Sequence, residues 1–139
     1  MISPCTDVRT VNMLVNHDDI RPFVGGGGEG LLDMRGAVLN ERNVFLLGEH
    51  GGFAFSADED GDGVEVHTMI KKSGRGQWAR DAARRAISYA NSAGHSRIWT
   101  KINPKLANVA AFAVEMGMQK TSESDSLFGE TFHIYEMDI

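Results

Sequence analysis

A run of alanines at helical spacing is the feature that most restricts how this chain can fold. Alanine recurs every three or four residues between positions 79 and 90, which places small side chains along one face of a helix. Because that face carries no bulky side chains, the helix can lie close against a β-sheet. The residues of the face are Ala79, Ala82, Ala83, Ala86, Ile87 and Ala90. We therefore expect a sheet that is covered by this helix.

Segments with strand or helix character flank this helix on both sides. Alternating or continuous apolar residues predict strands over residues 44–47, 53–55, 64–71, 97–102, 119–127 and 132–137. Further helices are expected over residues 8–15 and 105–116, whereas residues 31–43 fit either a broken helix or an irregular lid. The four glycines Gly25 to Gly28 are interpreted as a flexible connection. This order predicts one α/β (α+β) domain over residues 1–139, with a mixed and mostly antiparallel sheet.

Composition restricts the class of protein. The chain has 139 residues, of which 42% are hydrophobic, enough to fill one core. No apolar run approaches the roughly 20 residues of a membrane span, and the first residues lack the pattern of a secretory signal. Cys5 is the only cysteine, so an internal disulfide is excluded and a reducing, cytoplasmic setting is expected. The net charge of −5 argues against nucleic-acid binding.

The segment DEDGDG, residues 58–63, resembles the start of a calcium-binding EF-hand loop. Its aspartates alternate and Gly63 follows them, but Met69 stands at the twelfth position, where the loop needs a glutamate. Both flanks also have strand character. A polar turn between antiparallel strands is our interpretation, and a calcium site is the alternative. The histidines show no paired ligand spacing, so no zinc site is expected.

The turn KKSGRG, between a predicted strand and the alanine-faced helix, carries the most chemical information. Gly74 and Gly76 lie at a helix N-terminus, where backbone N–H groups lack intrahelical partners and the helix dipole favours anions. Lys71, Lys72 and Arg75 add positive charge beside these groups. The combination suits a small polyanion, and a solvated basic helix face is the alternative interpretation.

KKSGRG resembles the Q/R-x-x-G-x-G/A signature of the GNAT superfamily of N-acyltransferases, with Lys71 in the first position. The order of elements from Val44 onward, including a helix that ends in EMGM, is similar to the family's order. The segment HTMIKKSGRGQWA also resembles compact GNAT-like proteins of phage genomes, which would place the protein in a host cytoplasm. The resemblance implies acetyl-CoA as cofactor and direct attack by an amine of a small molecule or protein. It also allows a homodimer.

The resemblance implies a set of cofactor contacts. The pyrophosphate would lie on the backbone N–H groups of Lys72, Gly74, Arg75, Gly76 and Gln77. The pantetheine arm would follow Met69 and Ile70, with the Met69 N–H polarising the thioester carbonyl. Lys71 begins the motif, and Asn108 is the nearest candidate for a helix asparagine that often lies near the cofactor.

Glu65 and His67 are the candidate catalytic residues. They share one strand face about 7 Å apart, and both side-chain types transfer protons. Many family members carry a glutamate early in this strand, and Glu65 occupies that place. The amine would enter between residues 16–35 and this face, although a polar surface without catalytic function fits the same pattern. Ala113 stands where the family often has a tyrosine acid, so a non-catalytic phage structural or host-interaction module is the alternative function.

Overall fold

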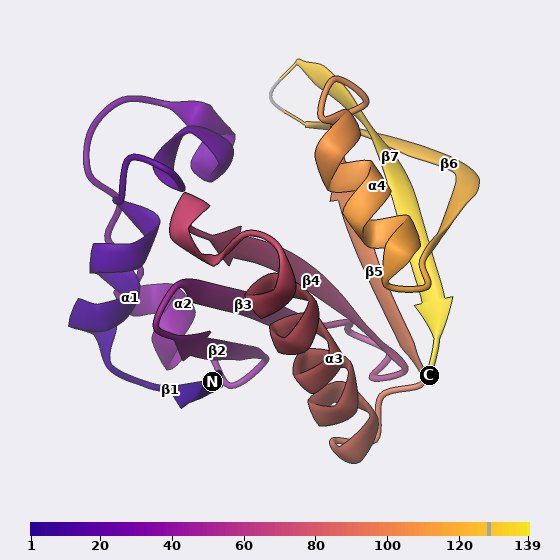
Figure 1. The fold of residues 1–139 in the computed structure, drawn as a ribbon, viewed down its shortest axis with the longest axis horizontal. Helices are drawn as coiled ribbons and strands as arrows, with labels where there is room; N and C mark the ends of the chain where they lie inside the picture. The colour runs from indigo at the N-terminus through magenta and orange to yellow at the C-terminus, as the bar shows by residue number, and fades with distance from the viewer. Residues whose placement is uncertain (128) are drawn as a thin grey trace.

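The alanine-rich segment forms helix α3 (Gln77–Ser92), which lies across one face of a sheet (Figure 1). Its alanine face is buried, and Ala82 at the centre has no exposed surface. The alanines pack against Phe53, Val64 and Val66 of the sheet in the larger hydrophobic core. The computed structural model describes residues 1–127 and 129–139, and it confirms the expected close packing of this helix on a sheet.

The sheet in the described residues has seven strands in the order β1-β2-β3-β4-β5-β7-β6. Neighbouring strands are antiparallel except for β4 and β5, which are parallel. The strands are β1 (Ser3–Cys5), β2 (Asn43–Gly48), β3 (Gly51–Ala57), β4 (Gly63–Ile70), β5 (Arg97–Ile102), β6 (Gln119–Leu127) and β7 (Glu130–Asp138). The predicted mixed and mostly antiparallel sheet is therefore confirmed.

Helices cover both faces of the sheet (Figure 1). Helix α4 (Ala107–Glu115) contributes Ala113 to the same core as α3. On the opposite face, α1 (Val8–Val15) and the short α2 (Arg35–Leu39) enclose a second core, in which Val11 and Val15 contact Met69 and its neighbours. No helix in the described ranges is long and apolar enough to cross a membrane.

The chain between α1 and α2 is more ordered than the sequence suggested. The Arg21 guanidinium donates hydrogen bonds to the carbonyls of Val24 (2.9 Å) and Gly30 (2.8 Å), and so it closes the glycine-rich loop around itself. Gly25, Gly26 and Gly27 all have positive φ, a conformation that glycine adopts without strain. Gly25 to Gly28, which we interpret from the sequence as a flexible connection, include a 3-10 turn over Gly25–Gly27 in the structure. The glycines supply the backbone geometry of this loop.

The DEDGDG segment forms the turn between β3 and β4, as predicted. The Gly61 N–H donates to the Asp58 carbonyl (3.0 Å), and the Asp58 N–H donates to the Gly63 carbonyl (2.9 Å). The Asp58 carboxylate accepts from the Trp99 indole N–H at 3.0 and 3.1 Å. The acidic turn is thus tied to the neighbouring strand β5.

Ala82→Leu tests the close approach of α3 to the sheet. The added side chain has no space at a fully buried position, so overpacking should lower the free energy of unfolding by about 1–3 kcal/mol. Urea denaturation measures the change. Ser88→Leu, at an exposed position of the same helix, is the matched control and should change stability by less than about 0.5 kcal/mol. Equal effects of the two substitutions would contradict the packing.

Candidate cofactor groove and active site

Strands β4 and β5 pair at one end and separate at the other (Figure 1). Their parallel register in the described residues runs from Gly63–Arg97 to Glu65–Trp99. One residue further along, the Thr100 hydroxyl donates to the Val66 carbonyl at 2.8 Å. Beyond this contact the strands diverge. We call the position of the Val66–Thr100 hydrogen bond the fork.

Beyond the fork, β4 presents an open backbone edge toward β5. The Val66 carbonyl points toward β5, and backbone groups alternate in direction along a strand, so those of Thr68 and Ile70 point the same way. Thr68 is exposed, although the adjacent Val66 on the same face is buried. The β4 edge therefore has no strand partner beside Thr68. We call this unpaired edge, from Ile70 to the fork, the groove.

The structure places Met69 differently from the sequence-based expectation. Its carbonyl oxygen is directed at Gly51 of β3, so its backbone belongs to the β3–β4 ladder. The Met69 side chain is 2% exposed and packs in the core beneath α1. The Met69 N–H therefore does not face the groove, and the N–H groups of Thr68 and Ile70 do. Sequence reasoning assigned the Met69 N–H to the cofactor side, whereas the structure directs the backbone of Met69 toward β3.

The KKSGRG turn uses some of its predicted donors internally. The Gly74 N–H donates to the Lys71 carbonyl (2.9 Å), and the Arg75 N–H donates more weakly to the Lys72 carbonyl (3.3 Å). These bonds form a short 3-10 turn over Lys72–Gly74. The free donors therefore lie at the end of the predicted set and just beyond it, at the start of α3.

Asp19 occupies another predicted donor. Its carboxylate accepts from the Lys72 N–H at 2.9 Å. This hydrogen bond lowers the pKa of Asp19; burial acts in the opposite direction, and the charges of Lys72 and Arg75 add to the lowering. The segment after α1 is thereby attached to the turn. One donor of the turn is thus already taken by a carboxylate of the same chain.

The N-terminus of α3 keeps its backbone donors available. Gly76 precedes the helix, and the Arg80 N–H makes the first intrahelical bond, to the Gly76 carbonyl at 3.1 Å. No side chain in the described residues caps this end, and its first turn contains no acidic residue. The N–H groups of Gly76, Gln77 and Trp78 are thus the donors that a phosphate group could reach. Gly76 and Gln77 belong to the predicted set.

Packing explains why the turn needs its two glycines. Gly74 is buried, and a Cβ there would collide with the Cβ of His50 and lie 3.0 Å from atoms of Ile70 and Trp78. Gly76 has φ +99°, which residues with a Cβ rarely adopt, but the space beside it is open. Gly74 therefore serves packing, whereas Gly76 serves the conformation that starts α3.

The β2–β3 turn supports the same site from behind. The His50 ring lies 2.8 Å (Nδ1) from the Ser73 hydroxyl and stacks edge-on against Trp78 at 5.0 Å. The Trp78 indole N–H donates to the Glu49 carboxylate at 3.0 Å. Sequence reasoning left Trp78 open as a cofactor cover or a packing anchor, and these contacts establish an anchor. His50 and Glu49 were not identified as site residues because nothing local in the sequence links them to the turn.

The two catalytic candidates lie together on the face opposite α3. The Glu65 carboxylate is 3.6 Å from the His67 Nε2, and the side chains are 19% and 52% exposed, respectively. Burial raises the pKa of Glu65, but the interaction with His67 and the charge of Lys101 outweigh it, so the net pKa is lowered. Glu65 therefore stays ionised near neutral pH, and His67 is the more accessible member of the pair.

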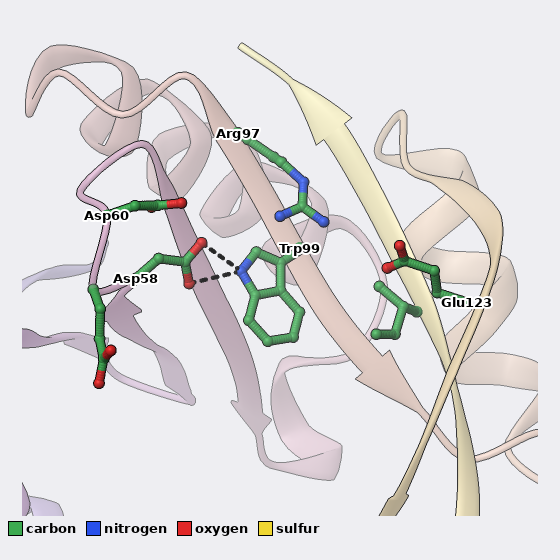
Figure 2. A pocket seen from close by; sticks show the side chains of 7 residues that line it. Asp58, Asp60, Arg97, Trp99 and Glu123 are labelled. Atoms are coloured by element: carbon green, nitrogen blue, oxygen red, sulfur yellow. Dashed lines mark hydrogen bonds between the residues drawn. The ribbon is translucent and has the colours of Figure 1, made fainter.

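Trp99, the β5 residue paired with Glu65, lines a shallow hollow of about 390 Å³; Figure 2 shows the residues around this hollow. Trp99, the sheet neighbour of Glu65, lies in the hollow with its indole fixed by Asp58. The cations of Arg97 and Lys101 lie 5.8 and 5.7 Å from the Trp99 ring. The lining is mostly acidic and consists of Asp58, Glu59, Asp60, Arg97, Trp99, Glu123 and Ile134. Sequence reasoning did not identify this hollow, which combines three distant segments.

The remaining candidate site residues lie on helix α4. Asn108 is exposed in its first turn, and no hydrogen bond in the described part of the chain joins it to the KKSGRG turn. Ala113 is 8% exposed within the core, so this position supplies no acid group. Arg80 of α3 and Glu115 of α4 form an ion pair at 2.6 Å that links the two helices across the groove side of the sheet.

Solved structures with the same fold are GNAT acetyltransferases. A probable GNAT-family acetyltransferase from Chromobacterium violaceum is 14% identical, with a TM-score of 0.77 over 99% of this chain and 81% of that one. A variant of spermidine N-acetyltransferase from Vibrio cholerae is 11% identical, with a TM-score of 0.77 over 99% and 92%. A putative acetyltransferase from Salmonella typhimurium, solved with acetyl-CoA, is 12% identical, with a TM-score of 0.68 over 99% and 94%.

These likenesses establish a GNAT-like fold. No family model matches the sequence, and no curated protein matches it. At 11–14% identity, the agreement lies in the arrangement of strands and helices rather than in individual residues. The sequence-based resemblance is therefore confirmed for the fold, and the residues of the site must be judged by their own geometry.

Gly74→Ala tests the packing of the turn. Its Cβ would collide with His50, so the turn must shift and the free energy of unfolding should fall by about 1–3 kcal/mol. Urea denaturation again measures the change. Gly36→Ala in α2, where a Cβ meets no atom within 4 Å, is the control and should leave stability unchanged or raise it. A neutral Gly74→Ala would show that the turn is not held as described.

Proposed function

We propose that this protein is an acetyl-CoA-dependent N-acetyltransferase that transfers an acetyl group to a cationic amine by direct attack. The observation that carries the proposal is that only the KKSGRG turn separates the unpaired edge of β4 from the uncapped N-terminus of α3. A helix end with free N–H groups suits a pyrophosphate, and an unpaired strand edge suits a ligand with amide groups. By analogy, the GNAT-like fold supports acetyl transfer as the chemistry.

The residues of the turn and the groove divide the work of holding the cofactor. The N–H groups of Gly76 and Gln77 would bind phosphate oxygens, with the charges of Lys71 and Arg75 nearby. The backbone of Ile70 would pair with the amide-bearing arm. The Thr68 N–H points into the groove closer to the fork, and we assign to it the polarisation of the thioester carbonyl that the sequence suggested for Met69. The cofactor supplies the activated acetyl group.

His67 is proposed to accept the proton of the attacking amine, and Glu65 to hold and stabilise the imidazolium. A carboxylate with a lowered pKa is a weak proton acceptor, which disfavours Glu65 as the base itself. Histidine is the side chain that changes charge most readily near neutral pH. The 3.6 Å separation from Glu65 and the exposure of His67 suit this division of roles.

The acidic hollow beside Trp99 supports a cationic acceptor. Four of its seven lining residues are acidic and one is basic, and Trp99 lies next to Glu65 in the sheet. A polyamine would place one amine at His67 while its other charges remain near the carboxylates of the hollow. One structural neighbour is named as a spermidine N-acetyltransferase, which acts on an amine of this class.

A non-catalytic binding module is the second candidate. The buried Ala113 favours it, because the position that supplies an acid in many GNAT enzymes offers no proton to a departing thiolate here. Such a module would keep the cofactor groove and lose turnover. A phage structural or host-interaction role belongs to this alternative.

Coenzyme A binding is the first test of the proposal. Acetyl-CoA at 100 times its Kd should stabilise the fold by about 2.7 kcal/mol, measured by thermal or urea unfolding. Gly76→Asp should weaken binding at least tenfold, because it adds strain and a negative charge beside the pyrophosphate. The control is Gly61→Asp, another open glycine with positive φ that lies in the β3–β4 turn. No stabilisation of the wild-type protein by millimolar acetyl-CoA would refute the proposed function.

Two substitutions test which of His67 and Glu65 is the base. With spermidine as acceptor and thiol release as the readout, His67→Gln should lower kcat by about 10²–10⁴-fold. Glu65→Gln should lower it by only about tenfold, since the imidazole remains in place. Neither change should alter the Kd for acetyl-CoA by more than about threefold, because both side chains lie on the face opposite the groove. A larger loss of kcat for Glu65→Gln than for His67→Gln would make Glu65 the base. Acetyl-CoA binding by the wild-type protein without any turnover would favour the non-catalytic binding module.

A further inference from the structure

We propose that Thr100 closes the end of the groove and thereby limits the transferred acyl group to a short chain. This inference rests on the proposed function, because it concerns the acyl end of the same cofactor. The Thr100 hydroxyl bonds the Val66 carbonyl at 2.8 Å, at the point where β4 and β5 begin to separate. Thr100 is thus the first β5 residue that an extended ligand in the groove would meet end-on.

The geometry of β4 defines the path to this point. From Ile70 to Val66 the strand advances four residues, or about 13 Å. A ligand that enters at the turn and pairs with the open edge passes Ile70 and Thr68 and then reaches the fork. There the sheet is continuous again, since Glu65 and Trp99 are paired. An extended chain cannot proceed without separating the two strands.

The residues around the half-buried Thr100 are themselves largely buried. Tyr135 of β7 pairs with Thr100 and is 8% exposed within the core. Val64 and Ile98, the paired residues two positions further along, are each 1% exposed. The hydrogen bond to Val66 fixes the Thr100 side chain, so its methyl and hydroxyl groups occupy the volume that a longer acyl chain would need. The volume of residue 100 therefore sets the permitted length.

The test compares the binding of acetyl-CoA and butyryl-CoA by isothermal calorimetry, which needs no acceptor. The wild-type protein should bind acetyl-CoA at least about tenfold more tightly, since extra methylenes that do not fit a closed pocket cost about that factor or more. Thr100→Ala removes side-chain volume at the fork and should reduce this preference to less than about threefold. Thr100→Val keeps the volume and loses only the hydroxyl, so it should retain the preference.

The outcomes separate this inference from the proposed function. If neither the wild-type protein nor any variant binds acetyl-CoA or butyryl-CoA, the proposed function fails, and the inference fails with it. If the wild-type protein binds both thioesters equally, or if Thr100→Ala keeps the wild-type preference, only the role of Thr100 is refuted. Should Thr100→Ala fail to fold, Thr100→Ser takes its place, because it removes only the methyl group and keeps the hydroxyl; a preference unchanged from wild type would then refute the role of Thr100.

Discussion

The loss of hydrogen bonding between β4 and β5 is the constraint on which the rest of the site depends. Backbone N–H and C=O groups in a protein interior need partners, so two strands that separate within a sheet must expose those groups to water or to a ligand. Here the Thr100 hydroxyl satisfies the last carbonyl at the fork, and the edge beyond it stays open. The small alanine face of α3 helps, because a helix seated close to the sheet holds β4 in place although β5 has left it.

The turn and its neighbours gather positive charge on a protein that is acidic overall. The net charge is −5, yet the start of α3 combines uncapped N–H groups with Lys71, Lys72 and Arg75. Asp19 already takes one donor of this turn and is held ionised there, so the local field favours anions in spite of the overall charge. Local arrangement of dipoles and charges therefore outweighs net charge at this site.

Sequence periodicity predicted most of the fold. The bounds of α1, β5 and β6 were predicted to the residue, because their apolar or polar patterns end at clear boundaries. The short β1 was missed, since three residues without alternation become a strand only by pairing with β2. Within the site, the KKSGRG motif located the turn, but internal hydrogen bonds shift the free donors to Gly76 and beyond. The hollow at Trp99 and the supports from Glu49 and His50 arise from distant segments, which no local pattern records.

The sheet also separates the two partners of the proposed reaction. The open edge at Thr68 and Ile70 is approached from the side of α3 and α4, whereas Glu65, His67 and Trp99 lie on the opposite face. A continuous sheet would keep a thioester and an amine on different sides, since its backbone forms a closed layer. The divergence of β4 and β5 beyond the fork removes that barrier over a short length next to His67. In the proposed reaction, this divergence would give an amine on one face access to an acyl group held from the other.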